Sequence, residues 1–464
     1  MFIRLRSLLA AAVCTLLPVL SIAANTTDAA WYEAEVAFLA DLKSRVTGSP
    51  NHNKLIDHVQ SELELLGLTV HTDTLNFTYL DQPFTPPILE VAGQEVEISS
   101  YAPYSGKAND TGVSGTLVDL IGPTIEPNWT QAAGNIAVLN ATNSPTNCSS
   151  ALALWPGQPP WYVETGPPTA TADPKIANLT AAAEAGVKGV IYVWQHISSG
   201  NARGQYVPFK RLYQGVPIVF IAGDTANTVL AATKAKKKAQ LTLSGNLVPK
   251  TPIRTIWDVI DGTTFKNESV IINTHTDSVN AVAENGHIAL LAKAKDLAAS
   301  PPERPTVLVF YLKGGAGQMK AVASVCVEHL GAVGWVEVLG SGTYYSAGNQ
   351  TDELLYANTP ELVNLTEQFW NGAYLGFVRI NDPIPKGVQS GEGEPLTDVQ
   401  IPNMSLITAP LYLLAEWPQD FDERQFVDVS AMKRQIDSFM RIWKVMDTMP
   451  VKSFGTVMVK PTTE

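Results

Sequence analysis

The sequence predicts an α/β protein of three layers, with helices on both faces of a mixed, mostly parallel sheet and a second module of strands and helices inserted into it. From residue 255 onward, short apolar strand segments alternate with helical segments, which is typical of parallel sheets buried on both faces. Between residues 112 and 247 the pattern changes to short apolar strands separated by long loops rich in Pro, Gly and Asn. A chain of 464 residues is long enough for two or three domains.

The N-terminus has the pattern of a secretory signal peptide. Arg4 and Arg6 precede an apolar run over residues 8–22, and small residues follow that run. The run is too short and too early for a membrane anchor, and no later run reaches the ~18 apolar residues that a spanning helix needs. We therefore expect removal of residues 1–23 and secretion, into the extracellular space or the lumen of the secretory pathway, of a protein that does not bind membranes.

Export is also favoured by the density of Asn-x-Ser/Thr sequons, which accept glycans in the eukaryotic secretory pathway. The predicted glycosylation sites are Asn76, Asn109, Asn128, Asn140, Asn147, Asn178, Asn267, Asn349, Asn364 and Asn403. The formal net charge of −12 argues against a nucleic-acid partner. Only Cys148 and Cys326 follow the signal peptide, and neither has a zinc-type spacing, so disulfides are not expected to be the main source of stability.

The mature chain divides into three parts. In the first, residues 24–111, helical spacing over residues 55–66 is followed by an alternating strand over residues 68–79. The second, residues 112–247, is the inserted module, with strands expected at "GTLVDL", "NIAVLN", "GVIYVW" and "VPIVFI" and helices at "IANLTAAAEAGV" and "TANTVLAATKAK".

The third part, residues 248–464, is expected to carry the strands of the main sheet. They are predicted at "TIWDVIDG", "SVIINTHTD" and "PTVLVFYL" and, after another helix, from "VCVEHLG" onward. A last amphipathic helix, "VSAMKRQIDSFMRIWKVMDTM", should pack on that sheet.

Polar side chains follow the strands of this third part. His275 and Asp277 end one strand, Glu328 ends a later one, and Glu284 lies in the turn into the next helix. Because ligands of open α/β sheets bind at the carboxyl ends of the strands, these side chains are candidates for one site. Imidazole and carboxylate groups are zinc ligands, so the first hypothesis is a metal site.

These residues resemble the secreted zinc aminopeptidases of metallopeptidase family twenty-eight (clan MH). The likeness rests on "HTDS", on the acidic-Asn-Gly turn after it, and on the acid that ends a later strand. The segment "SRVTGSPNHNKLIDHVQSELELLGLTVHTDT" is similar to the N-terminal part of these enzymes, and "AAEAGVKGVIYVW" with "GVPIVFIAGD" resembles their protease-associated (PA) domain. The resemblance covers nearly the whole mature chain and implies a zinc-exopeptidase-like domain with an inserted PA domain.

In that family two zinc ions share a bridging carboxylate and generate hydroxide, while a glutamate moves the proton. The resemblance implies that His275 is the first histidine ligand and that Glu284 takes the place of the bridging aspartate. It further implies that Glu328 is the later acidic ligand and that Asp277 holds the imidazole from behind.

The other half of the family's site is missing. Gly314 and Gly315 stand where the family has its Glu-Glu pair, so the catalytic-base position, Gly314, is not functional. Gly393 stands at the last histidine ligand, and no histidine follows His329. Glu284 is also one methylene longer than aspartate, which matters at zinc–oxygen distances of ~2.0–2.2 Å. At most one zinc ion is expected, and none is an equally open alternative.

Three interpretations of these residues stay open. One zinc ion binds His275, Glu284, Glu328 and a water molecule, or the residues are remnants that pair with each other and with water. In the third interpretation a second metal site has moved, with Glu392, Glu394, His287 and His329 as the candidates. The glycine-rich turn "LKGGAGQMK" is a weaker candidate, for an anion held by backbone N–H groups.

Three functions follow from these interpretations. The first is a secreted glycoprotein on a zinc aminopeptidase scaffold that is catalytically impaired and binds a peptide or protein ligand. The second is an active peptide hydrolase with an altered or single-metal site, and the third is an enzyme of another reaction type that reuses the pocket. A serine hydrolase is disfavoured because no G-x-S-x-G turn occurs, and a thiol enzyme because Cys326 lies in an apolar strand.

Overall fold

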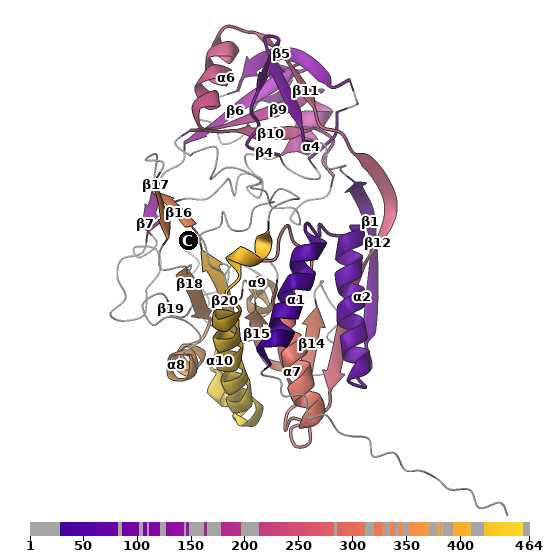
Figure 1. Cartoon of the computed structure of the whole chain (residues 1–464), viewed down its shortest axis with the longest axis vertical. Coiled ribbons are helices and arrows are strands. Elements are labelled where there is room, and N and C mark those ends of the chain that lie inside the picture. The colour runs from indigo at the N-terminus through magenta and orange to yellow at the C-terminus, as the bar shows by residue number, and fades with distance from the viewer. Residues whose placement is uncertain are drawn as a thin grey trace, which may run out of the picture.

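The protein is an α/β molecule with two eight-stranded sheets, each in its own unit (Figure 1). The computed structural model describes residues 28–81, 86–101, 105–108, 111–120, 127–142, 145–147, 162–164, 178–195, 213–282, 285–310, 320–327, 330, 335–338, 343–346, 352–370, 378–380, 383, 393–409 and 422–457. Within these residues no helix is long and apolar enough to cross a membrane.

The main unit is built on a mixed sheet with strand order β1-β12-β14-β13-β15-β20-β18-β19. Its strands are β1 (His71–Asp81), β12 (Asn246–Ile260), β13 (Glu268–Thr274), β14 (Thr306–Phe310), β15 (Lys320–Val327), β18 (Asp352–Ala357), β19 (Val378–Ile380) and β20 (Asn403–Ala409). Four of the seven neighbouring pairs are parallel: β13 with β14, β13 with β15, β15 with β20, and β18 with β19. This confirms the α/β prediction and the mostly parallel mixed sheet.

The centre of this sheet is buried on both faces. Successive side chains of a strand point to opposite faces, and both Ile271 and Ile272 of β13 are buried. Ile272 belongs to the main apolar core, which also contains Leu308 of β14 and Val327 of β15. Burial on both faces is the reason that these strands read as unbroken apolar runs in the sequence.

Helices pack on this sheet and on one another. They are α1 (Ala29–Leu42), α2 (Pro50–Leu65), α7 (His287–Ala299), α8 (Pro360–Phe369), α9 (Glu394–Asp398) and α10 (Val429–Thr448), with short 3-10 turns η4 (Glu423–Phe426) and η5 (Val451–Phe454). The start of α2 is fixed by Ser49, whose Oγ accepts a hydrogen bond from the His52 N–H at 3.1 Å, and by Pro50 in the first turn. Residues of α1, α2, α7 and α10 share the main core.

The inserted unit has its own sheet, of order β3-β2-β11-β5-β6-β9-β10-β4. Its elements are β2 (Ile88–Val91), β3 (Gln94–Val96), β4 (Ser100–Tyr101), β5 (Val113–Asp119), η1 (Trp129–Ala132), β6 (Ile136–Thr142), α4 (Leu179–Glu184), β9 (Gly189–Gln195), β10 (Ile218–Ile221), α6 (Asp224–Lys234) and β11 (Lys238–Thr242). Along β6, Ala137 and Leu139 enter one apolar cluster and Ile136 and Val138 the other, so this sheet also has a core on each face. Two small ribbons pair β7 (Pro145–Asn147) with β8 (Tyr162–Glu164) and β16 (Trp335–Val338) with β17 (Thr343–Ser346).

The chain enters and leaves the inserted unit through one antiparallel ribbon. β1 and β12 pair from His71↔Trp257 to Asp81↔Asn246, and Figure 1 shows this ribbon reaching toward the inserted unit. Residues 88–101, which the sequence analysis placed in the first part of the main domain, form β2, β3 and β4 of the inserted sheet. The boundary at residue 112 was therefore too late: β2 and β4 pair with β11 and β10, which lie more than a hundred residues further along the chain, and β3 joins this sheet through β2.

One expected element was wrong over its described part. A helix was expected between "PTVLVFYL" and "VCVEHLG", but residues 320–323 of that segment belong to β15 (Lys320–Val327), while residues 311–319 lie outside the described ones. The segment pairs in parallel with β13 over Glu268↔Lys320 to Asn273↔Cys326. Tertiary pairing to a central strand outweighs the helical propensity of the short Ala-containing run.

Candidate functional site

The site segment begins where β13 ends, at Thr274, and runs through residues 275–282. β13 lies between β14 and β15, parallel to both, so its end opens at the carboxyl edge of the sheet. His275 and Asp277 are each 3% exposed. The parallel sheet thus brings a histidine and a carboxylate to a buried position at the edge where ligands bind.

Asp277 orients the imidazole of His275. The Nδ1 of His275 lies 2.9 Å from Oδ1 of Asp277. Burial alone would raise the pKa of Asp277, but the hydrogen bond and charge of His275, the charge of His52 and a hydrogen bond from Thr47 together lower it to about 2. An ionised carboxylate only accepts, so Nδ1 carries the proton, and in the neutral imidazole Nε2 carries the lone pair. Second-sphere carboxylates of this kind set the tautomer of metal-binding histidines.

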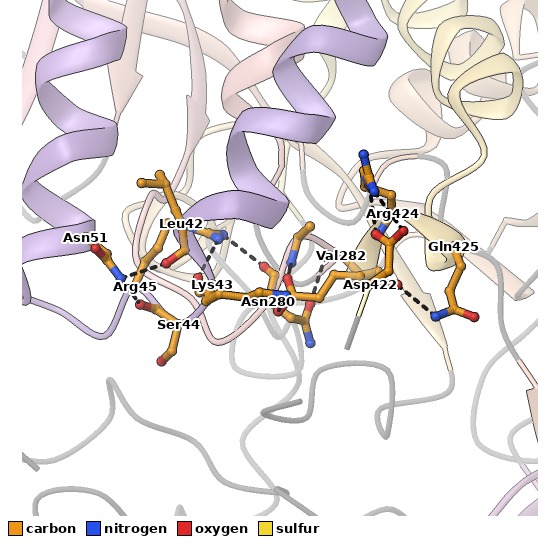
Figure 2. A network of polar contacts seen from close by, with 12 residues as sticks. Leu42, Lys43, Ser44, Arg45, Asn51, Asn280, Val282, Asp422, Arg424 and Gln425 are labelled. Carbon is orange, nitrogen blue, oxygen red and sulfur yellow. Dashed lines mark hydrogen bonds and ion pairs between the residues drawn. The ribbon is translucent and has the colours of Figure 1, made fainter. Parts of the chain in front are cut away.

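The other oxygen of Asp277 is held by a loop that precedes α2. Thr47 donates its hydroxyl to Oδ2 of Asp277. Arg45 pairs with Ser278 as an antiparallel bridge, through N–H to carbonyl distances of 2.6 Å and 3.0 Å. The buried guanidinium of Arg45 donates to the carbonyl of Asn280 at 2.9 Å and to that of Lys43 at 3.1 Å, as Figure 2 shows. Residues 43–47 therefore form a frame around the site segment.

His52 is a neutral structural residue of this frame. The N–H of Gly48 donates to its Nδ1 at 3.1 Å, so Nε2 carries the proton and donates to Oγ1 of Thr276 at 2.8 Å. Burial lowers the pKa of His52 to about 4, because the charged form would lose its hydration. With both ring nitrogens engaged, His52 positions the backbone between His275 and Asp277.

Glu423 of η4 fixes the far end of the site segment. Its Oε2 accepts the N–H of Ala281 at 2.9 Å, and its Oε1 lies 3.9 Å from Nζ of Lys43. Burial raises the pKa of Glu423 to about 7, against the opposite effect of Lys43 and of the Ala281 bond. Figure 2 shows this neighbourhood, in which Lys43, Asn280 and Asp422 come together from three distant parts of the chain.

The helix after the site segment starts against the ends of two strands. Asn285 donates to the carbonyl of Leu330 at 2.8 Å and accepts the Leu330 N–H at 2.7 Å. Gly286 has no room for a side chain, because a Cβ there would overlap the carbonyl oxygen of Val327 and the hydroxyl of Thr274. Glycine is needed here for close approach of the helix to β13 and β15.

Several predicted site residues lie outside the described residues: Gly314, Gly315, Glu284, Glu328, His329 and Glu392. Gly393 caps the short helix α9, whose first residue is Glu394. His287 is fully buried in the first turn of α7, and its Nε2 lies 3.8 Å from Oε2 of Glu35. Among the residues that the structure describes, no three His, Cys, Asp or Glu side chains are arranged to hold a metal ion.

The sequons differ in accessibility. Asn76, Asn128, Asn178, Asn267 and Asn364 are exposed, while the side chains of Asn109, Asn147 and Asn349 lie outside the described ones. Asn140 is half-buried and donates to Gln195 at 3.1 Å. Asn403 has no exposed surface and donates its Nδ2 to Ser324 at 2.8 Å. The prediction for Asn403 is corrected, because a glycan cannot be placed on a side chain inside the sheet.

Sequence reasoning missed the frame of the site. Arg45, Thr47, His52 and Glu423 each act on the site segment from at least 142 residues away, as the contacts with Asn280, Asp277, Thr276 and Ala281 show. The one signal available for the first three was the resemblance of the segment "SRVTGSPNHNK". Nothing in the sequence singled out Glu423.

Comparison with known proteins identifies the fold. No family model and no curated protein matches the chain. Among solved structures, the aminopeptidase from Aneurinibacillus sp. strain AM-1 superposes with a TM-score of 0.59 at 15% identity, covering 94% of this chain and 97% of that one. A zinc aminopeptidase from Bacillus subtilis gives 0.59 at 14% identity, covering 94% and 97%.

A peptidase M28 precursor from Shewanella amazonensis SB2B is similar to the same degree, with a TM-score of 0.59 at 15% identity over 95% of this chain and 96% of that one. Identities this low establish the architecture and leave the chemistry to the residues of this chain. The chain therefore has a zinc-exopeptidase-like α/β fold and shares it with zinc aminopeptidases of the M28 type.

Proposed function

We propose that this chain is a secreted glycoprotein on a zinc aminopeptidase scaffold that has lost two-zinc peptide hydrolysis and binds a peptide or protein ligand instead. The observation that carries the proposal is the glycine at positions 314, 315 and 393, together with the absence of any histidine after His329. Without a carboxylate at the base position, no group is available there to take the proton from an attacking water. The inserted unit is proposed to be a PA domain that contributes to ligand binding.

The sequence retains ligand types for one zinc ion and has glycine at the positions that would serve a second. In the neutral imidazole of His275, Nε2 carries the lone pair that a metal needs, because Nδ1 donates to the ionised Asp277. Glu284 and Glu328 are the proposed partners of His275, and these three would complete a site with one water molecule. A bound zinc would supply Lewis acidity there. At the positions that hold the second zinc ion in the family, this chain has glycine.

The ordered His275–Asp277 pair favours a second candidate function, a peptide hydrolase with a single metal. A carboxylate that accepts from one ring nitrogen is the arrangement found behind metal-binding histidines. In this alternative, His275, Glu284 and Glu328 would hold the zinc ion, which would supply Lewis acidity, and Glu284→Ala would eliminate turnover.

Turnover of aminoacyl substrates separates the two candidates. The mature glycoprotein is incubated with zinc and assayed beside His275→Ala, with binding of short peptides with free N-termini measured by calorimetry on both. The proposal predicts no turnover above that of His275→Ala, and peptide binding by the wild-type protein. Turnover that disappears in both His275→Ala and Glu284→Ala would overturn it in favour of the single-metal hydrolase.

A further inference from the structure

Three titratable side chains meet below the site, where α1, α2 and α7 pack. Glu35 of α1 is 5% exposed, and its Oε2 and Oε1 lie 3.0 Å and 3.2 Å from Nε2 of His58 on α2. The same Oε2 lies 3.8 Å from Nε2 of His287 on α7. His287 is fully buried, and neither of its ring nitrogens has a hydrogen-bond partner among the residues that the structure describes.

One carboxylate thus faces two imidazoles and bonds only one of them. The hydrogen bond to Glu35 raises the pKa of His58, because its effect is larger than the opposite effect of burial. Burial lowers the pKa of His287 well below its usual value, and the charges of Arg45 and His58 act in the same direction. The two histidines therefore respond to pH in opposite senses, although they share Glu35.

Among Glu35, Glu62, His58 and Lys295, positive and negative charges balance only when His58 is protonated. Glu62 of α2 lies 3.7 Å from Nζ of Lys295 on α7, and that ammonium sits 3.8 Å from the centre of the Trp31 ring. With His58 cationic, two carboxylates face two cations. Deprotonation of His58 leaves one negative charge uncompensated at a largely buried interface, which costs free energy. On the α10 side, Tyr32 of α1 has a pKa of about 12, raised by burial and by Asp437, and stays neutral throughout.

We propose that Glu35, His58 and His287 form a pH-sensitive clamp between α1, α2 and α7, which holds the first turn of α7 most firmly in the neutral to weakly acidic range and loosens on either side. The contribution of His58 is fully present below its ordinary pKa of 6.5 and is lost as the pH rises through its raised value. The contribution of His287 is present above 6.5 and is lost as the pH falls, because the unfolded chain then binds a proton that the folded chain does not.

The clamp bears on the site through α7. His287 is the first residue of that helix, and the preceding Gly286 lies against the ends of β13 and β15. A shift of this first turn would also move Asn285, whose side chain hydrogen-bonds the carbonyl of Leu330. The clamp does not depend on zinc binding or on turnover, so it stands or falls separately from the proposed function.

The test measures the melting temperature of the full mature protein from about pH 5 to about pH 8.5, a range that spans histidine titration. Three variants are compared with wild type: His58→Gln, Glu35→Gln and His287→Leu, with His71→Gln, an exposed histidine of β1, as the matched control. Between about pH 6.5 and about pH 8.5, the melting temperature should fall less in His58→Gln and in Glu35→Gln than in wild type. Between about pH 6.5 and about pH 5, the melting temperature of His287→Leu should fall less than that of wild type.

Contributions of His52 and Glu423 are present in every variant and cancel in the comparison with wild type. The clamp is overturned if the melting temperatures of His58→Gln and Glu35→Gln both fall as much as that of wild type toward about pH 8.5. It is also overturned if the melting temperature of His287→Leu falls as much as that of wild type toward about pH 5. Should His58→Gln fail to fold, Glu35→Gln alone decides the alkaline side. A change in His71→Gln as large as in the other variants would show a general effect of removing a histidine and would also overturn the clamp.

Discussion

At the scale of single residues, the charge state of Asp277 decides how His275 is presented. Its carboxylate accepts from His275 on one oxygen and from Thr47 on the other, and both partners are buried with it or beside it. A neutral side chain at this position could not hold the same tautomer with the same strength, because hydrogen bonds to charged groups are roughly twice as strong as neutral ones.

Asp277→Asn should remove a stabilising contribution that depends on pH. Because the pKa of Asp277 is lowered from 3.8 to about 2, its contribution is present above 3.8 and is lost as the pH falls toward 2. At neutral pH the contribution is on the order of 2 kcal/mol. Chemical unfolding between about pH 4.5 and about pH 2.5 should show a weaker pH dependence in Asp277→Asn than in wild type. Asp57→Asn, which changes an exposed carboxylate, is the control, and an equal slope in Asp277→Asn and wild type would contradict the account.

Glu423→Gln should have the opposite sign. The pKa of Glu423 is raised from 4.5 to about 7, so its contribution is fully present below 4.5 and is lost as the pH rises through 7. Glutamine keeps an acceptor for the Ala281 N–H and avoids the buried charge. The variant should therefore be more stable than wild type at about pH 8, by on the order of 2 kcal/mol, and close to it at about pH 4.5. Parallel stability curves for the two proteins would show that Glu423 is not titrating in the folded chain.

The residues of the site could be predicted only in part. His275 and Asp277 were found because they follow a buried strand directly, and the 2.9 Å contact between them joins residues two apart. Arg45, Thr47 and Glu423 could not be found, since their contacts depend on how distant segments fold back on β13. The prediction of a glycan on Asn403 was wrong, because this side chain is buried inside the sheet.

At the scale of elements, the start of α7 depends on the absence of a side chain at Gly286. Gly286→Ala should destabilise the protein by about 1–3 kcal/mol, because the new methyl group meets the backbone of Val327 and the buried Thr274, which cannot move aside cheaply. Gly189→Ala is the matched control, because the nearest atom there is a terminal methyl of Leu241 at 3.2 Å. Thermal unfolding of the two variants measures the difference. Equal melting temperatures would mean that α7 does not need close approach to β13 and β15.

Most elements were predictable because their patterns are local. The helical spacing over residues 55–66 matches α2 to within one residue at its end, and the strands "NIAVLN" and "GVIYVW" correspond to β6 and β9. The helix itself begins earlier than that spacing indicated, after the N-cap Ser49. The error at β15 arose where an Ala-containing run had no local signal strong enough to separate helix from strand.

At the scale of the whole molecule, the main uncertainty for sequence reasoning was where one unit gives way to the other. The short strands β2 and β4 pair with β11 and β10, far along the chain, and β3 joins the same sheet through β2. Neither their composition nor their spacing therefore assigns these strands to a sheet. The fold as a whole was predictable, since buried strands alternating with helices admit few architectures. Structures that share this architecture at 14–15% identity confirm it.

The proposed function depends on this chain having at most one metal position. Elemental analysis of bound metal per chain tests it most directly, on mature protein purified without chelators or affinity metals, with His275→Ala as the matched control. The account predicts at most one zinc ion per chain in wild type and none in His275→Ala. Two zinc ions per chain would contradict this prediction and would favour the hypothesis of an active two-metal peptidase.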